Sequence, residues 1–229
     1  WSGRDQGPYG LVSWWPSSLY VNNSDPHLSK KNVRWAISKF IDRDKVNDFA
    51  FANNGQISRY PWPAFKGLNS ITSDVDSIGV DTREYNPNES AKLLKSEGYT
   101  KKNGFWVDSN GNKIKCHIVA FGIFSDIGPV IAQTLVNAGI ESSYSEPPDA
   151  IDQLRSGKYN CSIFGHNGSQ TGSIYTTLSM YTTDSAQNWW NFSNNEYDEL
   201  VKKISTSADS DEIKNLTKKS HANLVIRTP

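Results

Sequence analysis

Aromatic side chains are the first candidates for ligand contact in this sequence. The chain of 229 residues contains eight tryptophans, with adjacent pairs at Trp14-Trp15 and Trp189-Trp190 and a further one, Trp62, between two prolines. Indole rings stack on flat apolar ligand faces, such as those of sugars, but they also bury large areas in protein cores. The residue types therefore predict either an aromatic binding surface or core packing, and for Trp189-Trp190 both interpretations stay open.

Carboxylates and cysteines give little support for catalysis or metal binding. Asp74, Asp76 and Asp108 lie in polar, turn-rich stretches without the spacing of an EF-hand or a nucleophile motif, so we interpret them as solvated. Cys116 and Cys161 lack further ligands at zinc-site spacing. They form either a disulfide between two strands of one sheet or two buried thiols. We expect no metal, no cofactor and no enzymatic activity.

The amino-acid composition limits the classes of protein to which this chain can belong. Basic and acidic residues number 24 each, so the chain lacks the electrostatic footprint of a nucleic-acid-binding protein. No apolar run approaches the roughly 20 residues that span a bilayer. Asn-x-Ser/Thr triplets recur along the chain and suit an exported protein. We expect an extracellular or periplasmic protein that is anchored to the membrane through a segment outside these 229 residues.

The first third of the chain predicts two helices separated by an irregular stretch. Apolar residues recur at helical spacing over 29–44, whereas 51–81 shows no period and is rich in Gly, Pro, Asn and Ser. Asn86 supplies a cap, followed by a first-turn proline and Glu89, and the helix that begins there ends at Gly98.

The remainder alternates strands and helices. Asn-Gly within 108–111 predicts a hairpin over 102–113. Turn residues and periodicity then predict strands over 114–120, 140–144 and 159–164 and helices over 126–138 and 150–156. Capping boxes begin two more helices at Ser193 and Asp209, and 224–226 reads as a last strand. This order predicts one α/β layer with partly parallel strands.

Five stretches carry a family resemblance. Leu19–Val46, LYVNNSDPHLSKKNVRWAISKFIDRDKV, combines an Asn-ended strand, a proline and a helix similar to VRxAIxxAIDR. Tyr85–Ala120 is similar to a YDPxKAKxLLxEAGY…DGxW run, and Thr134–Ser145 to xLxxxGIxV. Gly157–Gly168 and Phe192–Ile204 follow in order. Together these stretches resemble the C-terminal lobe of the family 5 extracellular solute-binding proteins, which serve ABC importers for peptides, nickel and oligosaccharides.

The resemblance implies a fold, partners and a function. The expected fold is α/β, a periplasmic-binding-protein-like lobe with a mixed sheet flanked by helices. Residues 1–229 are expected to form a single C-terminal lobe, with the N-terminal lobe and a return segment absent. The expected function is capture of an oligopeptide or oligosaccharide in an interlobe cleft for an ABC permease. A glycoside hydrolase and a ligand-sensing receptor without transport are the alternatives.

The lobe architecture also implies where a ligand lies. In α/β sheets the ligand faces the carboxyl ends of the strands. Phe121, Phe124 and Ser125 follow the strand that ends at Ala120, where an aromatic face and free backbone N–H groups could meet a polar ligand. The segment after Ile163 and the segment around Trp189 are expected near the same edge, and Trp190 and Trp62 are further candidates for stacking. Packing within a turn is the alternative for Phe124.

The stretch Gly165–Gln170 departs from the pattern of peptide-binding relatives. Those relatives have a Trp and then an Asp in this stretch, and the Asp pairs with the amino terminus of the peptide. By register, His166 replaces that Trp and Ser169 that Asp, with Asn167 and Gln170 beside them. A buried ammonium without a carboxylate partner is costly. Neutral donors and acceptors suit a sugar better, although His166 is alternatively a structural histidine.

Overall fold

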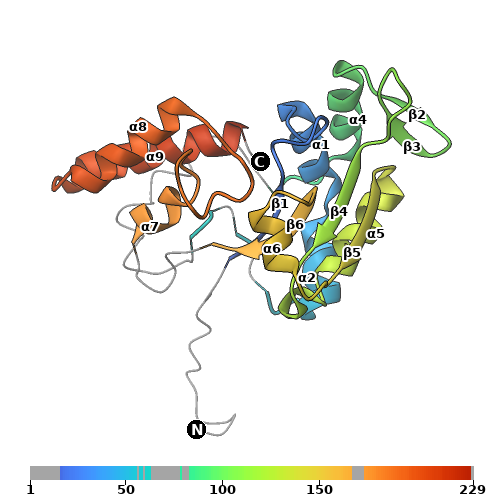
Figure 1. The fold of residues 1–229 in the computed structure, drawn as a ribbon, viewed down its shortest axis with the longest axis horizontal. Coiled ribbons are helices and arrows are strands. Elements are labelled where there is room, and N and C mark those ends of the chain that lie inside the picture. The colour runs from blue at the N-terminus through green and yellow to red at the C-terminus, as the bar shows by residue number, and fades with distance from the viewer. Residues whose placement is uncertain are drawn as a thin grey trace, which may run out of the picture.

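A four-stranded mixed sheet forms the centre of the molecule (Figure 1). Its strands are β1 (Ser17–Val21), β4 (Lys115–Val119), β5 (Glu141–Ser145) and β6 (Cys161–Gly165), and their order in space is β1-β6-β4-β5. The computed structural model describes residues 16–55, 57–58, 60–62, 78, 83–166 and 173–227 of the chain.

The sheet combines parallel and antiparallel pairs, as the sequence predicts. Strand β4 runs parallel to both β5 and β6, whereas β1 runs antiparallel to β6. Cys116 and Cys161 lie on the neighbouring strands β4 and β6 with their Cα atoms 5.3 Å apart, and they form a disulfide. The first of the two interpretations of these cysteines is therefore correct.

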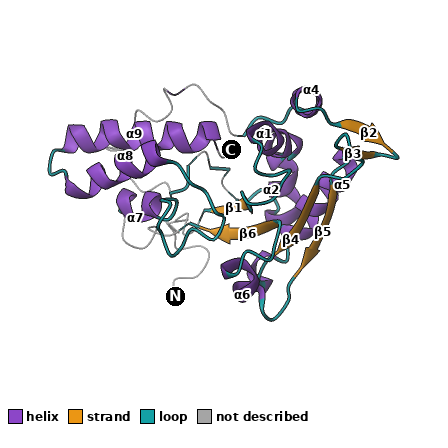
Figure 2. Ribbon diagram, turned by 45° about the horizontal axis from the view of Figure 1, so that its top comes forward, coloured by secondary structure: helices purple, strands orange, loops and turns teal. Residues whose placement is uncertain are grey.

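One face of the sheet is covered by α1 (Lys31–Phe40) and α5 (Gly128–Ala138), as Figure 2 shows. Helix α4 (Pro87–Ser96) packs against α1, and α2 (Arg43–Phe51) packs against α5. Alternate strand residues point into this layer. The main core thus combines fully buried residues from helices and strands, among them Val33, Ile37, Leu94, Ile118, Leu135 and Ile163.

The other face of the sheet is covered by α6 (Ala150–Arg155) and by the turn that contains Trp189. Helices α7 (Ile174–Ser179), α8 (Asn195–Thr206) and α9 (Ser210–Arg227) form a C-terminal layer that extends away from the sheet in Figure 1. A second core lies there and includes Tyr20, Trp62, Leu178, Trp190, Tyr197 and Leu224. None of the helices that the structure describes is long and apolar enough to cross a lipid bilayer.

Local capping signals place several helix ends correctly. The Asn86 side chain accepts a hydrogen bond from the backbone N–H of Glu89 at 3.0 Å, as a cap should. Gly139 ends α5 with φ at 95°, a conformation that glycine adopts without strain. Helix α8 begins one residue later than predicted, because Asn194 and not Ser193 caps it.

Two predicted elements are wrong, and a third lies mostly outside the described residues. The helix expected over 29–44 breaks at Ile41, which is extended, and Asp42 then caps α2, which runs into the stretch expected to be irregular. The strand expected over 224–226 is the last turn of α9, because Leu224 packs into the second core. Most of the stretch 51–81 lies outside the described residues.

The predicted hairpin has different partners. Val107 bridges to Lys113 across the 108–111 turn, but this bridge is isolated. The paired strands are β2 (Thr100–Lys102) and β3 (Phe105–Val107), joined at a second Asn-Gly turn in which Asn103 and Gly104 both have positive φ.

Candidate ligand-binding site

The carboxyl ends of β4 and β6 meet at one edge of the sheet, which we name the carboxyl edge. Strand β4 ends at Val119 and is followed by a turn of 3-10 helix, η3 (Gly122–Phe124), that leads into α5. Strand β6 ends at Gly165, and the antiparallel β1 begins there with Ser17. Residues that follow or precede these strands are therefore brought together from distant parts of the chain.

Three half-buried aromatic side chains form a row at this edge. The ring centroids of Phe121 and Phe164 lie 5.6 Å apart with their planes at 67°. Those of Phe164 and Trp189 lie 5.4 Å apart at 62°. Both contacts have the edge-to-face geometry that aromatic rings favour. We call Phe121, Phe164 and Trp189 the aromatic row.

Trp189 is held in position by its surroundings. The Tyr159 hydroxyl donates to the Trp189 carbonyl at 2.8 Å, and the Trp189 indole N–H donates to the Ala186 carbonyl at 3.0 Å. The Arg155 guanidinium lies 5.5 Å from the centroid of the indole ring, within the range of a cation–π contact. The row is thus a fixed apolar surface with one cation beside it.

A second group of side chains lies on the same face of β1 and β6. His166 Nε2 lies 2.7 Å from the Ser18 hydroxyl, and His166 Nδ1 lies 2.7 Å from the Tyr20 hydroxyl. The Tyr181 hydroxyl also contacts His166 Nδ1 and lies 3.0 Å from that of Tyr20. We call Ser18, Tyr20, His166 and Tyr181 the hydroxyl–imidazole cluster. A neutral imidazole can donate from one nitrogen and accept at the other, so hydroxyl groups satisfy both.

Burial keeps this cluster uncharged. His166 is 4% exposed, and loss of water lowers its pKa to about 3. Burial also raises the pKa of Tyr20 and that of Tyr181 above the usual range of a phenol. At neutral pH the cluster therefore presents neutral donors and acceptors and no charge.

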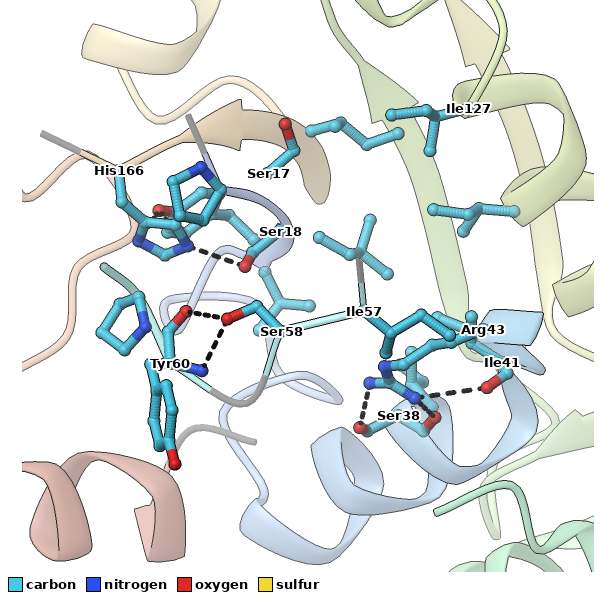
Figure 3. A pocket seen from close by; sticks show the side chains of 18 of the residues that line it. Ser17, Ser18, Ser38, Ile41, Arg43, Ile57, Ser58, Tyr60, Ile127 and His166 are labelled. Atoms are coloured by element: carbon cyan, nitrogen blue, oxygen red, sulfur yellow. Dashed lines mark hydrogen bonds between the residues drawn. The ribbon is translucent and has the colours of Figure 1, made fainter. Parts of the chain in front are cut away.

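The cluster borders a cavity of about 440 Å³, part of which Figure 3 shows. Predominantly apolar side chains from β1, α1, α5 and α9 surround it, together with His166 and Trp190. Arg34 and Arg43 also line it, and no Asp or Glu is present among its lining residues, which all belong to the described ranges. Burial of Arg34 lowers its pKa to about 10, so the guanidinium stays protonated.

Four of the predicted site residues lie in two pairs in the structure. Phe121 and Trp189 meet in the aromatic row, while His166 and Trp190 meet at the cavity. Trp190 is buried and stacks on Tyr20 with the ring centroids 3.9 Å apart. Trp189 and Trp190 belong to a turn, and the Trp190 ring is buried whereas the Trp189 ring is half-buried.

The remaining candidates are buried or not described. Phe124 is 3% exposed and belongs to the main core, as the packing interpretation expects. Trp62 is 2% exposed and stacks on Tyr60 in the second core. Neither side chain is open to a ligand in this structure. Asn167, Ser169 and Gln170 lie outside the described residues.

Sequence reasoning did not single out several members of the site, although it placed the segment after Ile163 near the ligand. Phe164 follows the buried Ile163, and strand alternation places it on the opposite face at the end of β6, so period-2 reasoning could have found it. Ser18 and Tyr20 lie opposite Phe164 and Ser162 across the β1–β6 pair. No sequence signal predicts this antiparallel register.

Within the described ranges, no three His, Cys, Asp or Glu side chains gather closely enough to hold a metal ion.

Comparison with known proteins assigns the fold to a family. The model of the bacterial extracellular solute-binding proteins, family 5 middle part, matches residues 6–189. A probable ABC transporter-binding protein of Deinococcus radiodurans is 31% identical over 94 residues, which are 40% of this chain and 15% of that protein.

Solved structures of similar fold include a mannohexaose-bound periplasmic oligopeptide-binding protein of Thermotoga maritima. The two structures superpose with a TM-score of 0.83 and share 21% sequence identity, and the match covers 98% of this chain and 44% of that one. The oligopeptide-binding protein AppA of Bacillus subtilis, in complex with a nonapeptide, has a TM-score of 0.78 and 18% identity, covering 95% and 44%.

These proteins are longer than the chain described here. The chain spans less than half the length of the two solved structures and a smaller share of the curated relative. The likeness to the solved structures establishes the mixed α/β fold of the predicted lobe. Because the family model covers most of the chain, the chain belongs to the family 5 bacterial extracellular solute-binding proteins.

Proposed function

We propose that residues 1–229 form one lobe of the solute receptor of an ABC importer, and that the carboxyl edge contacts a neutral oligosaccharide. The observation that carries this proposal is the aromatic row, a fixed surface of three half-buried rings at the edge where α/β sheets bind ligands. Sugar rings have apolar faces that stack on such surfaces. The second lobe and the permease are the partners that this function requires.

The charge state of the neighbouring side chains supports a neutral solute. His166, which occupies the register of the aromatic residue of peptide-binding relatives, is buried and neutral. The similar Thermotoga maritima protein was crystallised with mannohexaose. An uncharged ligand avoids the desolvation cost of a buried charge, which exceeds the value of an ordinary hydrogen bond.

An oligopeptide is the second candidate, and one observation favours it. Glu146 follows β5 at the same edge, where its carboxylate accepts a hydrogen bond from the Tyr144 hydroxyl at 2.9 Å. A Cβ atom added to Gly122 would lie 3.3 Å from this carboxylate, so the two residues are close neighbours. A carboxylate in this place could pair with the amino terminus of a peptide.

Isothermal titration calorimetry of the full-length polypeptide with manno-oligosaccharides and with short peptides tests both candidates. We expect heat with a saccharide and an affinity at least about 10-fold lower in Trp189→Ala, which corresponds to about 1.4 kcal/mol. Tyr85→Ala is the matched control, because Tyr85 is an exposed aromatic residue just before α4.

The two candidates differ in their response to Glu146→Gln. Loss of the carboxylate should weaken peptide binding and leave saccharide binding within experimental error. Saccharide binding that is equal in Trp189→Ala and Tyr85→Ala would contradict the role of the aromatic row. Absence of heat with either class of solute would contradict the receptor function itself.

A further inference from the structure

Four aromatic rings lead from the carboxyl edge to the hydroxyl–imidazole cluster. The ring centroids of Trp189 and Trp190 lie 6.4 Å apart, and those of Trp190 and Tyr20 lie 3.9 Å apart with their planes at 17°. The ring centroid of Tyr181 lies 5.8 Å from that of Trp190 and 6.4 Å from that of Tyr20. Indole and phenol give up a single electron more readily than other aromatic side chains, so rings in contact provide a path for an electron. We call these four residues the Trp–Tyr series.

The two ends of the series differ in their exposure to solvent. Trp189 is half-buried at the carboxyl edge, whereas the other three rings are buried. An oxidant in solution therefore reaches the series first at Trp189. The electron that Trp189 loses can then be replaced from the inner rings, which are shielded from water and from the reagents dissolved in it.

Trp190 has no base to which it could lose its indole proton. An oxidised indole is acidic at Nε1, and it becomes a neutral radical only where a base accepts that proton. Nε1 of Trp190 is buried and has no hydrogen-bond partner among the described residues. At Trp189 the same atom donates to the Ala186 carbonyl, which accepts the hydrogen bond but not the proton. The oxidised state is therefore free to move on to the tyrosines.

The two tyrosines have the base that Trp190 lacks. The Tyr20 hydroxyl lies 2.7 Å from His166 Nδ1 and 3.0 Å from the Tyr181 hydroxyl, which also contacts Nδ1. The imidazole can accept at Nδ1 when its proton is on Nε2, 2.7 Å from the Ser18 hydroxyl (Figure 3). One phenol therefore donates to Nδ1, and the other can donate to the oxygen of the first.

An oxidised phenol is acidic enough to protonate this imidazole. Burial lowers the pKa of His166 to about 3, so at neutral pH the ring takes no proton from water. A phenol that has lost an electron is a far stronger acid than an imidazolium of that pKa, and its proton therefore crosses to Nδ1. The proton then remains within hydrogen-bond distance of the oxygen that it left.

A neighbouring tyrosine lacks such a base. The Tyr159 hydroxyl donates to the Trp189 carbonyl at 2.8 Å, so its proton faces a carbonyl and not an imidazole. Tyr159 is buried like Tyr20. Proton transfer requires a base within hydrogen-bond reach. We therefore expect oxidation to end at Tyr20 or Tyr181 and not at Tyr159.

We propose that the Trp–Tyr series is a one-electron relay from Trp189 to the two buried tyrosines, with His166 as the proton acceptor. A radical oxidant takes one electron from the Trp189 indole and is itself reduced. One electron then passes from a tyrosine through Trp190 to Trp189, and the O–H proton of that tyrosine moves to His166 Nδ1. A one-electron reductant such as ascorbate later returns the electron, and the proton goes back to the phenol oxygen. The relay spares Trp189, whichever solute the protein binds.

Pulse radiolysis of the full-length polypeptide with the azide radical tests the relay. This radical takes one electron from indole or phenol side chains and becomes azide. In the wild type we expect the absorbance of the indole radical to decay while that of the phenoxyl radical rises, at a rate independent of protein concentration. The rate should fall in heavy water, because an O–H proton moves in the same step. Equal rates in heavy and ordinary water would overturn the proposal.

Two variants interrupt the relay at different points. Tyr20→Phe/Tyr181→Phe keeps both rings and removes the protons that move to His166. Trp190→Phe replaces the intermediate indole by a ring that the azide radical does not oxidise. Each variant should lose most of the conversion of indole radical to phenoxyl radical. Tyr159→Phe is the matched control, because it removes a buried tyrosine and should keep the conversion. Conversion at the wild-type rate in both relay variants would contradict the relay.

Product mapping shows whether the relay protects Trp189. After exposure to azide radicals in aerated buffer, peptide mass spectrometry should find several-fold more oxidised Trp189 in Trp190→Phe than in the wild type or in Tyr159→Phe. Equal oxidation of Trp189 in all three proteins would show that no electron reaches it from the inner rings. Urea unfolding checks the fold of each variant. If a relay variant fails to fold, the heavy-water measurement on the wild type still decides the proposal.

Discussion

His166 is buried, and the loss of water favours its neutral imidazole, whose two ring nitrogens lie beside the hydroxyl groups of Ser18 and Tyr20. Its folded-state pKa is about 3, below the value of 6.5 that an exposed histidine has in the unfolded chain. As pH falls below 6.5, the unfolded chain binds a proton that the folded chain does not. Stability is therefore complete above that pH and declines toward pH 3, by up to about 1.4 kcal/mol for each pH unit.

The pH dependence of urea unfolding measures this effect. Between pH 7.5 and pH 5, both chosen to bracket the ordinary histidine pKa of about 6.5, the wild-type free energy of unfolding should fall more than that of His166→Gln. His117→Gln is the matched control, because His117 is partly exposed and hydrogen-bonded to Ser143. Equal pH dependence in the wild type and in His166→Gln would show that His166 does not carry the effect.

At the scale of elements, the disulfide between β4 and β6 joins two strands that are 45 residues apart in sequence. A cross-link that closes a loop of this length stabilises the fold by about 4 kcal/mol if it acts by restricting the unfolded chain. We expect the double variant Cys116→Ala/Cys161→Ala to lose a comparable amount in urea unfolding. Reductant should destabilise the wild type and leave the double variant unchanged, and insensitivity of the wild type would contradict a stabilising role.

The start of α5 depends on a glycine for packing and not for backbone conformation. A Cβ atom at Gly128 would lie 1.9 Å from Cε2 of Tyr144, so one of the two residues would have to move. Gly128→Ala should therefore destabilise the protein by about 1–3 kcal/mol in urea or thermal unfolding. Adding Tyr144→Ala should make the effect of Gly128→Ala smaller, because the clash is gone. Additive effects of the two substitutions would rule out this explanation.

Sequence reasoning succeeded for elements whose signals are local. The Asn86 cap, the α5 stop at Gly139 and the parallel core strands follow from neighbouring residues, and the structure confirms them. It failed where distant packing decides, since 224–226 has the β-branched composition of a strand but completes a helix in the second core. The pairing of Phe121, Phe164 and Trp189 likewise depends on strand order, which no single stretch of sequence encodes.

At the scale of the whole molecule, the main core lies on one face of the sheet, the second core joins Tyr20 of β1 to the C-terminal helices, and the aromatic row stands at the end of the sheet. Under the proposed function, residues 1–229 form one lobe of a receptor and this row contacts one side of the solute. In two-lobed receptors the other side is covered when the lobes close, so each lobe contributes only part of the contacts. The affinity of this lobe alone for a saccharide should therefore be much lower than that of the full-length polypeptide.

Parallel titrations of residues 1–229 and of the full-length polypeptide measure this difference. We expect the lobe to bind the same oligosaccharide at least about 100-fold more weakly, a loss of about 2.7 kcal/mol. A cooperative urea transition of the isolated lobe is the required control, because an unfolded lobe would also bind weakly. Equal affinity in the two proteins would place the whole binding site on this lobe, and the interlobe cleft would then have no part in holding the solute.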